Sequence, residues 1–222
     1  MTLAPNSTNI ASTQAPSDLL DALLGVFSAK GFEGASLAEL SRACDRSKAS
    51  LYHHFPGGKA EMIQVLKERC INDLDQHAFA HLRALATTKP SPEGRSEKVA
   101  WRALETFIDG FDDYLQAHNG HCLLATLALT QPDLLAPDTQ RHLTDWQHLL
   151  RSLFEQLGHK PKRARRSAHA LLARLYGSLT LAAMGTGVST QQACELLKKD
   201  LQKDRKRDLR LNLRRGEHKK RT

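Results

Sequence analysis

The sequence predicts an all-α protein, in which a small N-terminal domain of three short helices precedes a larger helical domain. Two observations favour this fold class. Apolar residues recur at intervals of three and four along most of the 222 residues, which is the spacing of one face of a helix. Aromatic residues make up only 5% of the chain, and no segment alternates apolar and polar residues as a strand does.

The first predicted helix follows a polar segment. Residues 1–16 are rich in Ser, Thr, Asn and Pro and lack periodicity, so we expect a disordered arm there. We expect Ser17 to cap the helix that follows, whose apolar residues run from Leu19 to Phe27. Gly31 is expected to end this helix, because glycine readily takes the left-handed conformation that closes many helices.

A tight turn joins the next two predicted helices. Ser36 and Glu39 have the spacing of a capping box, which places the start of a short second helix directly after Ser36. Asp45 and Arg46 form the turn, and Ser47 caps a third short helix. Three short helices, of which the last two are joined by a tight turn, are typical of a helix-turn-helix domain.

Helical periodicity continues through most of the remaining chain and predicts the larger helical domain. Two prolines and a glycine mark residues 87–94 as a linker, and residues 203–222 show no clear apolar face. The chain therefore divides into an arm, a helix-turn-helix domain, a larger helical domain and a basic tail, at residues 1–16, 17–60, 61–202 and 203–222. The further helices are expected at residues 59–86, 97–118, 121–130, 138–157, 160–184 and 189–201.

The net charge of +8 lies mainly in the tail. Residues 203–222 contain ten Lys or Arg and three Asp or Glu, so they carry +7 and the rest of the chain carries +1. Residues 17–60 contain five basic and five acidic residues and are neutral by count. The tail is interpreted either as a disordered basic arm that adds non-specific DNA affinity or as a solubilising terminus. The case for DNA binding by residues 17–60 therefore depends on the positions of particular side chains and not on net charge.

Several classes of protein and of site are disfavoured by the sequence. The four cysteines are far apart, which fits neither a zinc site nor a disulfide framework. His77 and His81 have the spacing of metal ligands, but we interpret them as part of a solvated helix face. No glycine-rich phosphate loop or hydrolase motif occurs, so we expect no enzyme activity, no cofactor and no metal. We also expect neither a signal peptide nor a membrane span, and therefore a cytoplasmic protein.

The third predicted helix has the features of a DNA-recognition helix. Leu51 and Phe55, one turn apart, form the apolar face that anchors it, and its other faces are free to enter a major groove. Lys48 can donate to guanine and Ala49 can contact a thymine methyl group, whereas hydroxyls, imidazoles and helix N-termini suit phosphates. The predicted DNA contacts are Ser36, Arg46, Ser47, Lys48, Ala49, Ser50, Tyr52, His53, His54 and Lys59.

The run from Leu19 to Glu61, about a fifth of the chain, contains a series of residues in a recognisable order. These residues are Phe27, Lys30, Gly31, Phe32, Ser36, Leu37, Leu40, Ala43, Ser47, Leu51, Tyr52, His53, His54 and Phe55. In this order they resemble the N-terminal domain of the tetracycline-repressor (TetR/AcrR) family of transcriptional regulators. The phrase YHHFPGGK, together with the later GHCLL, resembles the LmrA/YxaF-type subgroup.

One departure from that family lies in the turn. The family has Gly-Val-Ser where this chain has Asp45, Arg46 and Ser47. Aspartate tolerates a left-handed backbone better than most residues, so we expect the turn to be kept. Arg46 is expected to add a phosphate contact. The different turn sequence is expected to affect the register of the protein on DNA and its preference for a binding site more than the fold.

The resemblance implies how the whole chain works. It implies a double-stranded DNA operator as partner and a homodimer, in which helices near 161–184 and 189–201 bind their copies as a four-helix bundle. It also implies an unidentified small apolar or aromatic effector that binds in the C-terminal domain. Its binding changes the distance between the two helix-turn-helix domains of the dimer and releases a repressor from DNA. A regulator of the same fold without a small-molecule ligand, controlled by a partner or constitutive, stays open.

Aromatic, apolar and histidine residues in the larger domain are candidates for the effector pocket. Each aromatic or apolar candidate is as well explained by an ordinary core. His118 and His121 flank a glycine break, where a polar lid is one interpretation, and Cys122 lies in an apolar run, where thiols tend to be inert. The candidates are Trp101, Phe107, Phe111, His118, His121, Cys122, Trp146, Tyr176 and Met184.

Overall fold

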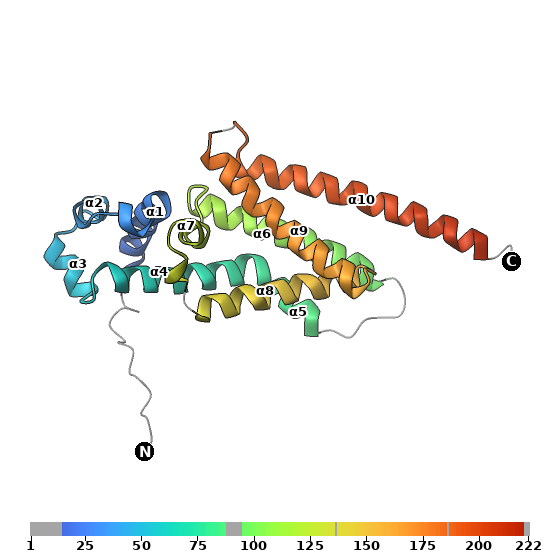
Figure 1. Ribbon diagram of the computed structural model, residues 1–222, viewed down its shortest axis with the longest axis horizontal. Helices are drawn as coiled ribbons and strands as arrows, with labels where there is room; N and C mark the ends of the chain where they lie inside the picture. The colour runs from blue at the N-terminus through green and yellow to red at the C-terminus, as the bar shows by residue number, and fades with distance from the viewer. Residues whose placement is uncertain (1–14, 88–94, 136, 186, 220–222) are drawn as a thin grey trace, which may run out of the picture. The chain divides into compact units, whose positions relative to one another are not determined.

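The computed structural model describes residues 15–87, 95–135, 137–185 and 187–219, and within these ranges the chain forms helices and no strand (Figure 1). The all-α prediction is confirmed for this part of the chain. The predicted arm up to residue 14 and the predicted linker from residue 88 to residue 94 lie outside the described residues. None of the described helices is both long and apolar enough to cross a lipid bilayer.

The chain divides into two compact units. The first unit comprises Met1–Ala80 and Tyr114–His148, and the second comprises His81–Asp113 and Leu149–Thr222. The functional division into a DNA-binding domain at 17–60 and an effector-binding and dimerisation domain at 61–202 stays a prediction.

The first unit is built around the N-terminal helices. Its helices are α1 (Ser17–Gly34), α2 (Leu37–Ala43), α3 (Lys48–His54), α4 (Lys59–Leu74), α7 (Leu123–Thr130) and the beginning of α8 (Pro137–Gln156). A short 3-10 turn, Pro132–Leu134, follows α7. α1 packs against α2, α4 and α7, and Leu23, Phe27 and Leu40 are fully buried in this unit. The bounds of α2 and α3 agree with those expected from the sequence, because both helices begin at local capping residues.

α1 differs from its prediction at both ends. Ser17 is the first helical residue and not the cap; Pro16 precedes the helix, and no side chain caps it. Gly31 has φ 70° and interrupts the helix as expected, but a further helical turn continues to Gly34. A Cβ atom at Gly31 would lie 3.2 Å from Oγ1 of Thr130 in α7. Both the positive φ and this close neighbour therefore favour glycine at position 31.

The long helix expected at residues 59–86 is interrupted. α4 ends at Leu74, a π-helical turn spans Asp75–Phe79, and α5 (Ala80–Thr87) follows. Trp146 of α8 lies against the π turn. Its indole ring stacks on Phe79 with centroids 4.7 Å apart, and its Nε1 donates a hydrogen bond of 3.1 Å to Oδ1 of Asp75. The non-α turn, a rare feature in helices, is therefore matched by a specific side-chain contact.

The second unit consists of nearly all of α5, most of α6 (Arg95–Ala117), the end of α8, α9 (Pro161–Ala183) and α10 (Thr190–Lys219). α9 packs on α10. Leu104, Phe107, Leu171, Leu175 and Leu197 are buried in this unit, which accounts for the apolar periodicity of α6, α9 and α10.

α10 begins as expected but continues well beyond its predicted end. Ser189 accepts a hydrogen bond from the backbone N–H of Gln192, whose side chain accepts one from the backbone of Ser189, so the two form a capping box. The sequence analysis ended this helix near residue 201 and treated the following tail as disordered, whereas the helix continues to Lys219. The reason is local, because no proline and no glycine before residue 216 interrupts a run rich in Lys, Arg, Leu and Gln.

Candidate nucleic-acid interface

Two capped helices and a tight turn form the candidate interface. The hydroxyl of Ser36 accepts a hydrogen bond of 3.2 Å from the backbone N–H of Glu39, whose carboxylate accepts one of 3.1 Å from the backbone of Ser36. Ser47 caps α3 in the same manner, accepting from the backbone N–H of Ser50 at 3.1 Å. The beginning of each helix is thus fixed by residues within one turn.

The turn between α2 and α3 adopts the backbone that its unusual sequence predicts. Asp45 has φ 49°, which lies in the left-handed region. The backbone N–H of Arg46 donates to the carbonyl of Ser41 at 3.1 Å, and the hydroxyl of Ser41 donates to the carbonyl of Arg46. The turn is therefore closed by hydrogen bonds that do not need a glycine at its first position.

One face of α3 is buried and the opposite face is exposed. Leu51 and Phe55 have no exposed surface. Lys48, Ala49, Tyr52 and His53 are exposed, and Ser50 and His54 are half-buried. We call the side chains of Lys48, Ala49, Tyr52 and His53 the recognition face.

The carboxylates of the N-terminal helices have partners outside the recognition face. Glu39 forms an ion pair with Lys30, and its pKa is lowered to about 2, first by the hydrogen bond from Lys30 and then by the hydrogen bonds from Ser36. Asp18 lies 3.6 Å from the guanidinium of Arg46. Lys48 has no ion-pair partner among the described residues. A region that is neutral by count therefore presents a cation at the beginning of α3.

Lys59 and Tyr52 lie where α3 leads into α4. The ammonium group of Lys59 lies 4.6 Å from the centre of the Phe32 ring, a cation–π contact with α1. The ring of Tyr52 approaches Gly58, where an added Cβ would lie 3.4 Å from Cε1 of the tyrosine. The backbone N–H of Gly57 donates to the carboxylate of Glu61 at 2.7 Å and holds this connection in place.

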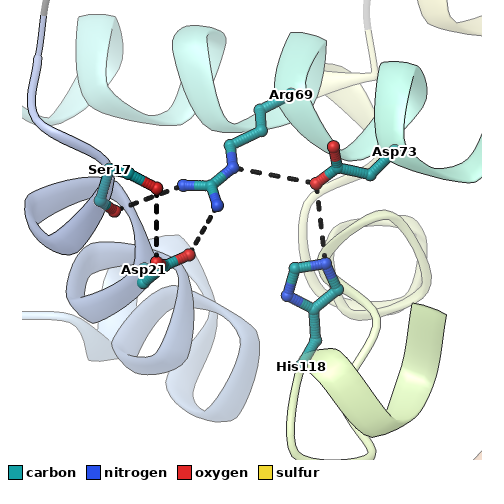
Figure 2. Close-up of polar contacts among 5 residues, drawn as sticks. All are labelled: Ser17, Asp21, Arg69, Asp73 and His118. Carbon is teal, nitrogen blue, oxygen red and sulfur yellow. Dashed lines mark hydrogen bonds and ion pairs between the residues drawn. The ribbon is translucent and has the colours of Figure 1, made fainter. Parts of the chain in front are cut away.

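Arg69 of α4 is the centre of a polar network that holds α1 (Figure 2). Its guanidinium donates to Oδ1 of Asp21 at 2.5 Å and to the carbonyl of Ser17 at 3.5 Å. It also pairs with Asp73, one turn further along α4, at 3.7 Å. His118, directly after α6, places its Nε2 3.7 Å from the same Asp73 carboxylate. The network ties the first helix to α4 and to the segment before α7.

Comparison with known proteins shows what this region of the chain is similar to. Residues 19–66 match the family described as "Bacterial regulatory proteins, tetR family". The similarity to this family covers the segment that contains α2 and α3. No curated sequence matches the chain significantly. Nothing in these comparisons distinguishes the LmrA/YxaF-type subgroup, which stays a prediction.

Solved structures of tetR-family regulators share the fold over most of the chain. A TetR transcriptional regulator from Legionella pneumophila is 13% identical, with a TM-score of 0.63 over 90% of this chain and 99% of that chain. The TetR-family regulator PfmR from Thermus thermophilus is 18% identical, with a TM-score of 0.58 over 82% and 94%. A regulator from Agrobacterium tumefaciens is 18% identical, with a TM-score of 0.58 over 83% and 96%. At these identities the likeness concerns the fold.

The residues predicted to line an effector pocket are divided between the two units. A pocket of about 160 Å³ opens in the second unit, and Trp101 is the candidate that lies on it. Phe107 and Phe111 are buried, the ring of Tyr176 meets Phe111 edge to face, and Met184 is exposed.

The other candidates belong to the first unit. His118 packs its ring on Tyr114 with centroids 4.5 Å apart, and His121 is exposed. Trp146 lies on the π turn, as described above. Cys122 is buried, and burial raises the pKa of its thiol, which is consistent with an inert side chain.

The sequence analysis did not predict the polar residues of α4 that hold the neighbouring segments in place. Arg69 and Asp73 have the i, i+4 spacing of a helical ion pair, but nothing in the sequence indicates their long-range partners. Lys67 is buried and donates a hydrogen bond of 2.5 Å to the carbonyl of Leu134, and burial lowers the pKa of its ammonium group. Its place in the sequence, between the apolar Leu66 and a surface glutamate, gives no sign of this.

Proposed function

We propose that the chain is a homodimeric repressor that binds a double-stranded DNA operator through α3 and is released by a small ligand. The observation that carries this proposal is the recognition face: an exposed cation at the start of a short helix that is anchored from behind by two buried side chains. Such a helix fits the major groove, with its N-terminal residues at the base edges.

Roles in DNA contact follow from placement. Lys48 and Ala49 are assigned to base edges, because they lie in the first turn of α3. Arg46 is assigned to a phosphate, for which it would exchange its exposed ion pair with Asp18. The remaining assigned contacts to phosphate or sugar are Ser36, Ser47, Ser50, Tyr52, His53, His54 and Lys59.

The proposed dimer forms through α9 and α10. Ala173, Gly177 and Thr180 are exposed on α9, and Met184 is exposed directly after it; the four recur at intervals of four, three and four residues. This is the spacing of a seam between packed helices, and the small side chains allow the backbones to approach closely. Leu196, which is 56% exposed on α10, supplies a further apolar side chain without cover.

The pocket of the second unit favours control by a small molecule over the alternative of a partner-controlled or constitutive regulator. In the proposed mechanism the ligand shifts the distance between the two α3 helices of the dimer. Half-sites lie about 34–36 Å apart, one turn of DNA, so a change in this distance weakens binding to both at once.

The DNA-binding proposal is tested by Lys48→Ala and Tyr52→Ala. Each is expected to lower the affinity for an operator selected from random duplexes by about 1–3 kcal/mol, roughly five- to 150-fold, because a major-groove or adjacent contact is lost. Thermal unfolding should be unchanged, since both side chains are exposed. Lys162→Ala, an exposed lysine on α9, is the matched control. Equal affinities of all three variants and the wild type would overturn the assignment of α3.

A further inference from the structure

The pocket of the second unit has an apolar wall that suits a small hydrocarbon group. It opens between α6, the end of α8, α9 and α10 and measures about 160 Å³. A cavity of about 150 Å³ is known to hold a benzene molecule. Trp101, Phe154, Leu171 and Leu197 line the pocket, and each is largely buried and contributes an apolar surface.

The opposite side of the pocket carries cations and oriented polar groups. Arg163 and Arg174, eleven residues and so about three turns apart on one face of α9, both line it, and Arg174 is held at 2.7 Å by Asp200 of α10. His159 also lines it, with its ring stacked on Phe154 at 5.4 Å and its Nδ1 3.1 Å from the hydroxyl of Ser167. These contacts fix the polar side before any ligand arrives.

A buried donor lies beside the pocket without an acceptor. The guanidinium of Arg205 lies 5.3 Å from the centre of the Trp101 ring, and its Nε is buried with no hydrogen-bond partner among the described residues. Buried donors are almost always satisfied, so an exception next to a pocket indicates a missing acceptor.

The charges around the pocket sum to a positive value. Arg163 and Arg174 line it together with Asp204, Arg205 lies over Trp101, and Asp200 pairs with Arg174, so these five groups carry a net charge of +1. An apolar wall opposite a cationic rim is complementary to a molecule with a compact hydrocarbon body and one anionic group.

We propose that this pocket binds a small apolar carboxylate, with the hydrocarbon body against Trp101 and the carboxylate on the side of the pocket that carries the arginines. This assignment rests on the proposed function as a ligand-controlled regulator and names the class of its ligand. α9 and α10 wall the pocket and also form the proposed dimer contact. A ligand between them therefore has a direct route to the geometry of the dimer.

Calorimetric titration of the full chain tests the assignment, with benzoate as the probe. Benzoate is expected to bind saturably. Benzamide, which has the same shape without the charge, should bind at least about tenfold more weakly, and benzylamine should not bind, because hydrogen bonds to a charged group are lost or reversed. Cyclohexanecarboxylate should bind within about tenfold of benzoate, since the apolar wall selects size more than aromaticity.

Variants locate the site. Arg163→Gln and Trp101→Leu should each weaken benzoate binding at least about tenfold, by loss of a charged donor and of a ring contact. Arg165→Gln, an exposed arginine on the same helix outside the pocket, should leave it unchanged. Circular dichroism confirms that each variant is folded. Equal binding of benzoate, benzamide and benzylamine, no binding at all, or equal effects of Arg163→Gln and Arg165→Gln would each overturn the proposal.

A separate measurement distinguishes failure of this inference from failure of the proposed function. Operator affinity is measured with and without saturating benzoate. Binding of benzoate that leaves operator affinity unchanged supports the carboxylate site and contradicts its role in release. Operator binding by a protein that binds none of the probes supports the DNA-binding function and contradicts the carboxylate site.

Discussion

Single residues decide the local geometry of the candidate DNA interface. Glu39 does two things at once: its carboxylate completes the cap of α2 at Ser36 and pairs with Lys30 of α1. Asp45 adopts the left-handed conformation that a glycine usually supplies, so the turn keeps its shape with a different sequence. The contacts of Glu39 and the backbone conformation of Asp45 thus shape α2 and the turn that follows it.

The lowered pKa of Glu39 predicts a pH dependence of stability. Its pKa in the folded protein is about 2, below the ordinary value of 4.5, so its contribution to stability is present above pH 4.5 and is lost as the pH falls towards about 2. Glu39→Gln is therefore expected to lower the free energy of unfolding at neutral pH, and this difference should shrink over that acidic interval. Urea unfolding of both proteins across the pH range measures it.

The partner of Glu39 is tested by a double-mutant cycle. Because the hydrogen bond from Lys30 is the largest cause of the lowered pKa, the pH-dependent part of the Glu39→Gln effect should be reduced in a Lys30→Gln background. An effect of the same size and pH dependence in both backgrounds would show that Lys30 is not the cause.

At the scale of elements, the helices that begin with local signals are those the sequence predicts best. Ser36, Ser47 and Ser189 each cap the helix expected after them, because a cap is made by residues within one turn. Where a boundary depends on a distant segment, prediction fails. The π turn at Asp75–Phe79 meets Trp146, and no periodicity indicates this contact.

The functional residues also divide into those that local spacing predicts and those that depend on contacts with distant segments. The exposed and buried faces of α3 follow from the spacing of Leu51 and Phe55, so the recognition face was predictable. The link from Arg69 to Asp21 spans 48 positions in the chain, and that from Trp101 to Arg205 joins two distant helices. Such contacts form only when helices pack, so the spacing of residues in the sequence does not indicate them.

Two glycines of α1 predict opposite effects on stability. Gly31→Ala is expected to lower the free energy of unfolding by about 1–3 kcal/mol, because alanine would be strained at φ 70° and would approach Thr130. Gly25→Ala is the matched control on the same helix. An added Cβ meets no atom there within 4 Å, so it should stabilise by about 0.5–1 kcal/mol. Chemical unfolding measures both, and a stabilising Gly31→Ala would contradict the strained backbone.

At the scale of the whole molecule, the proposed function needs two copies. One α3 helix contacts one half-site. A repressor gains its operator affinity, and the fixed distance between its two α3 helices, by holding two DNA-binding domains together. The exposed seam of α9 is the feature on which this depends, since it presents small and apolar side chains to solvent along several turns.

Gly177→Arg is expected to separate the dimer without unfolding the chain. An added Cβ at Gly177 meets no atom within 4 Å, so the substitution is tolerated within one copy. At the proposed seam it would bury an unpaired charge, which costs several kcal/mol, and the dissociation constant should rise at least about 100-fold. Sedimentation velocity measures the mass.

Gly25→Arg is the control for this experiment, because Gly25 is equally open and belongs to α1, which is not part of the proposed seam. It should sediment like the wild type. A Gly177→Arg protein that remains dimeric would show that the dimer interface does not lie at this seam.

The two tryptophans of the chain lie one in each unit, Trp146 against the π turn and Trp101 beside the cationic pocket. Indole emission responds to its surroundings, so the protein carries a native optical probe in each unit. With Trp146→Phe the remaining emission would report on the pocket alone, and with Trp101→Phe on the packing of the first unit alone. Movement in either half of the molecule thus becomes observable by light, without an attached label.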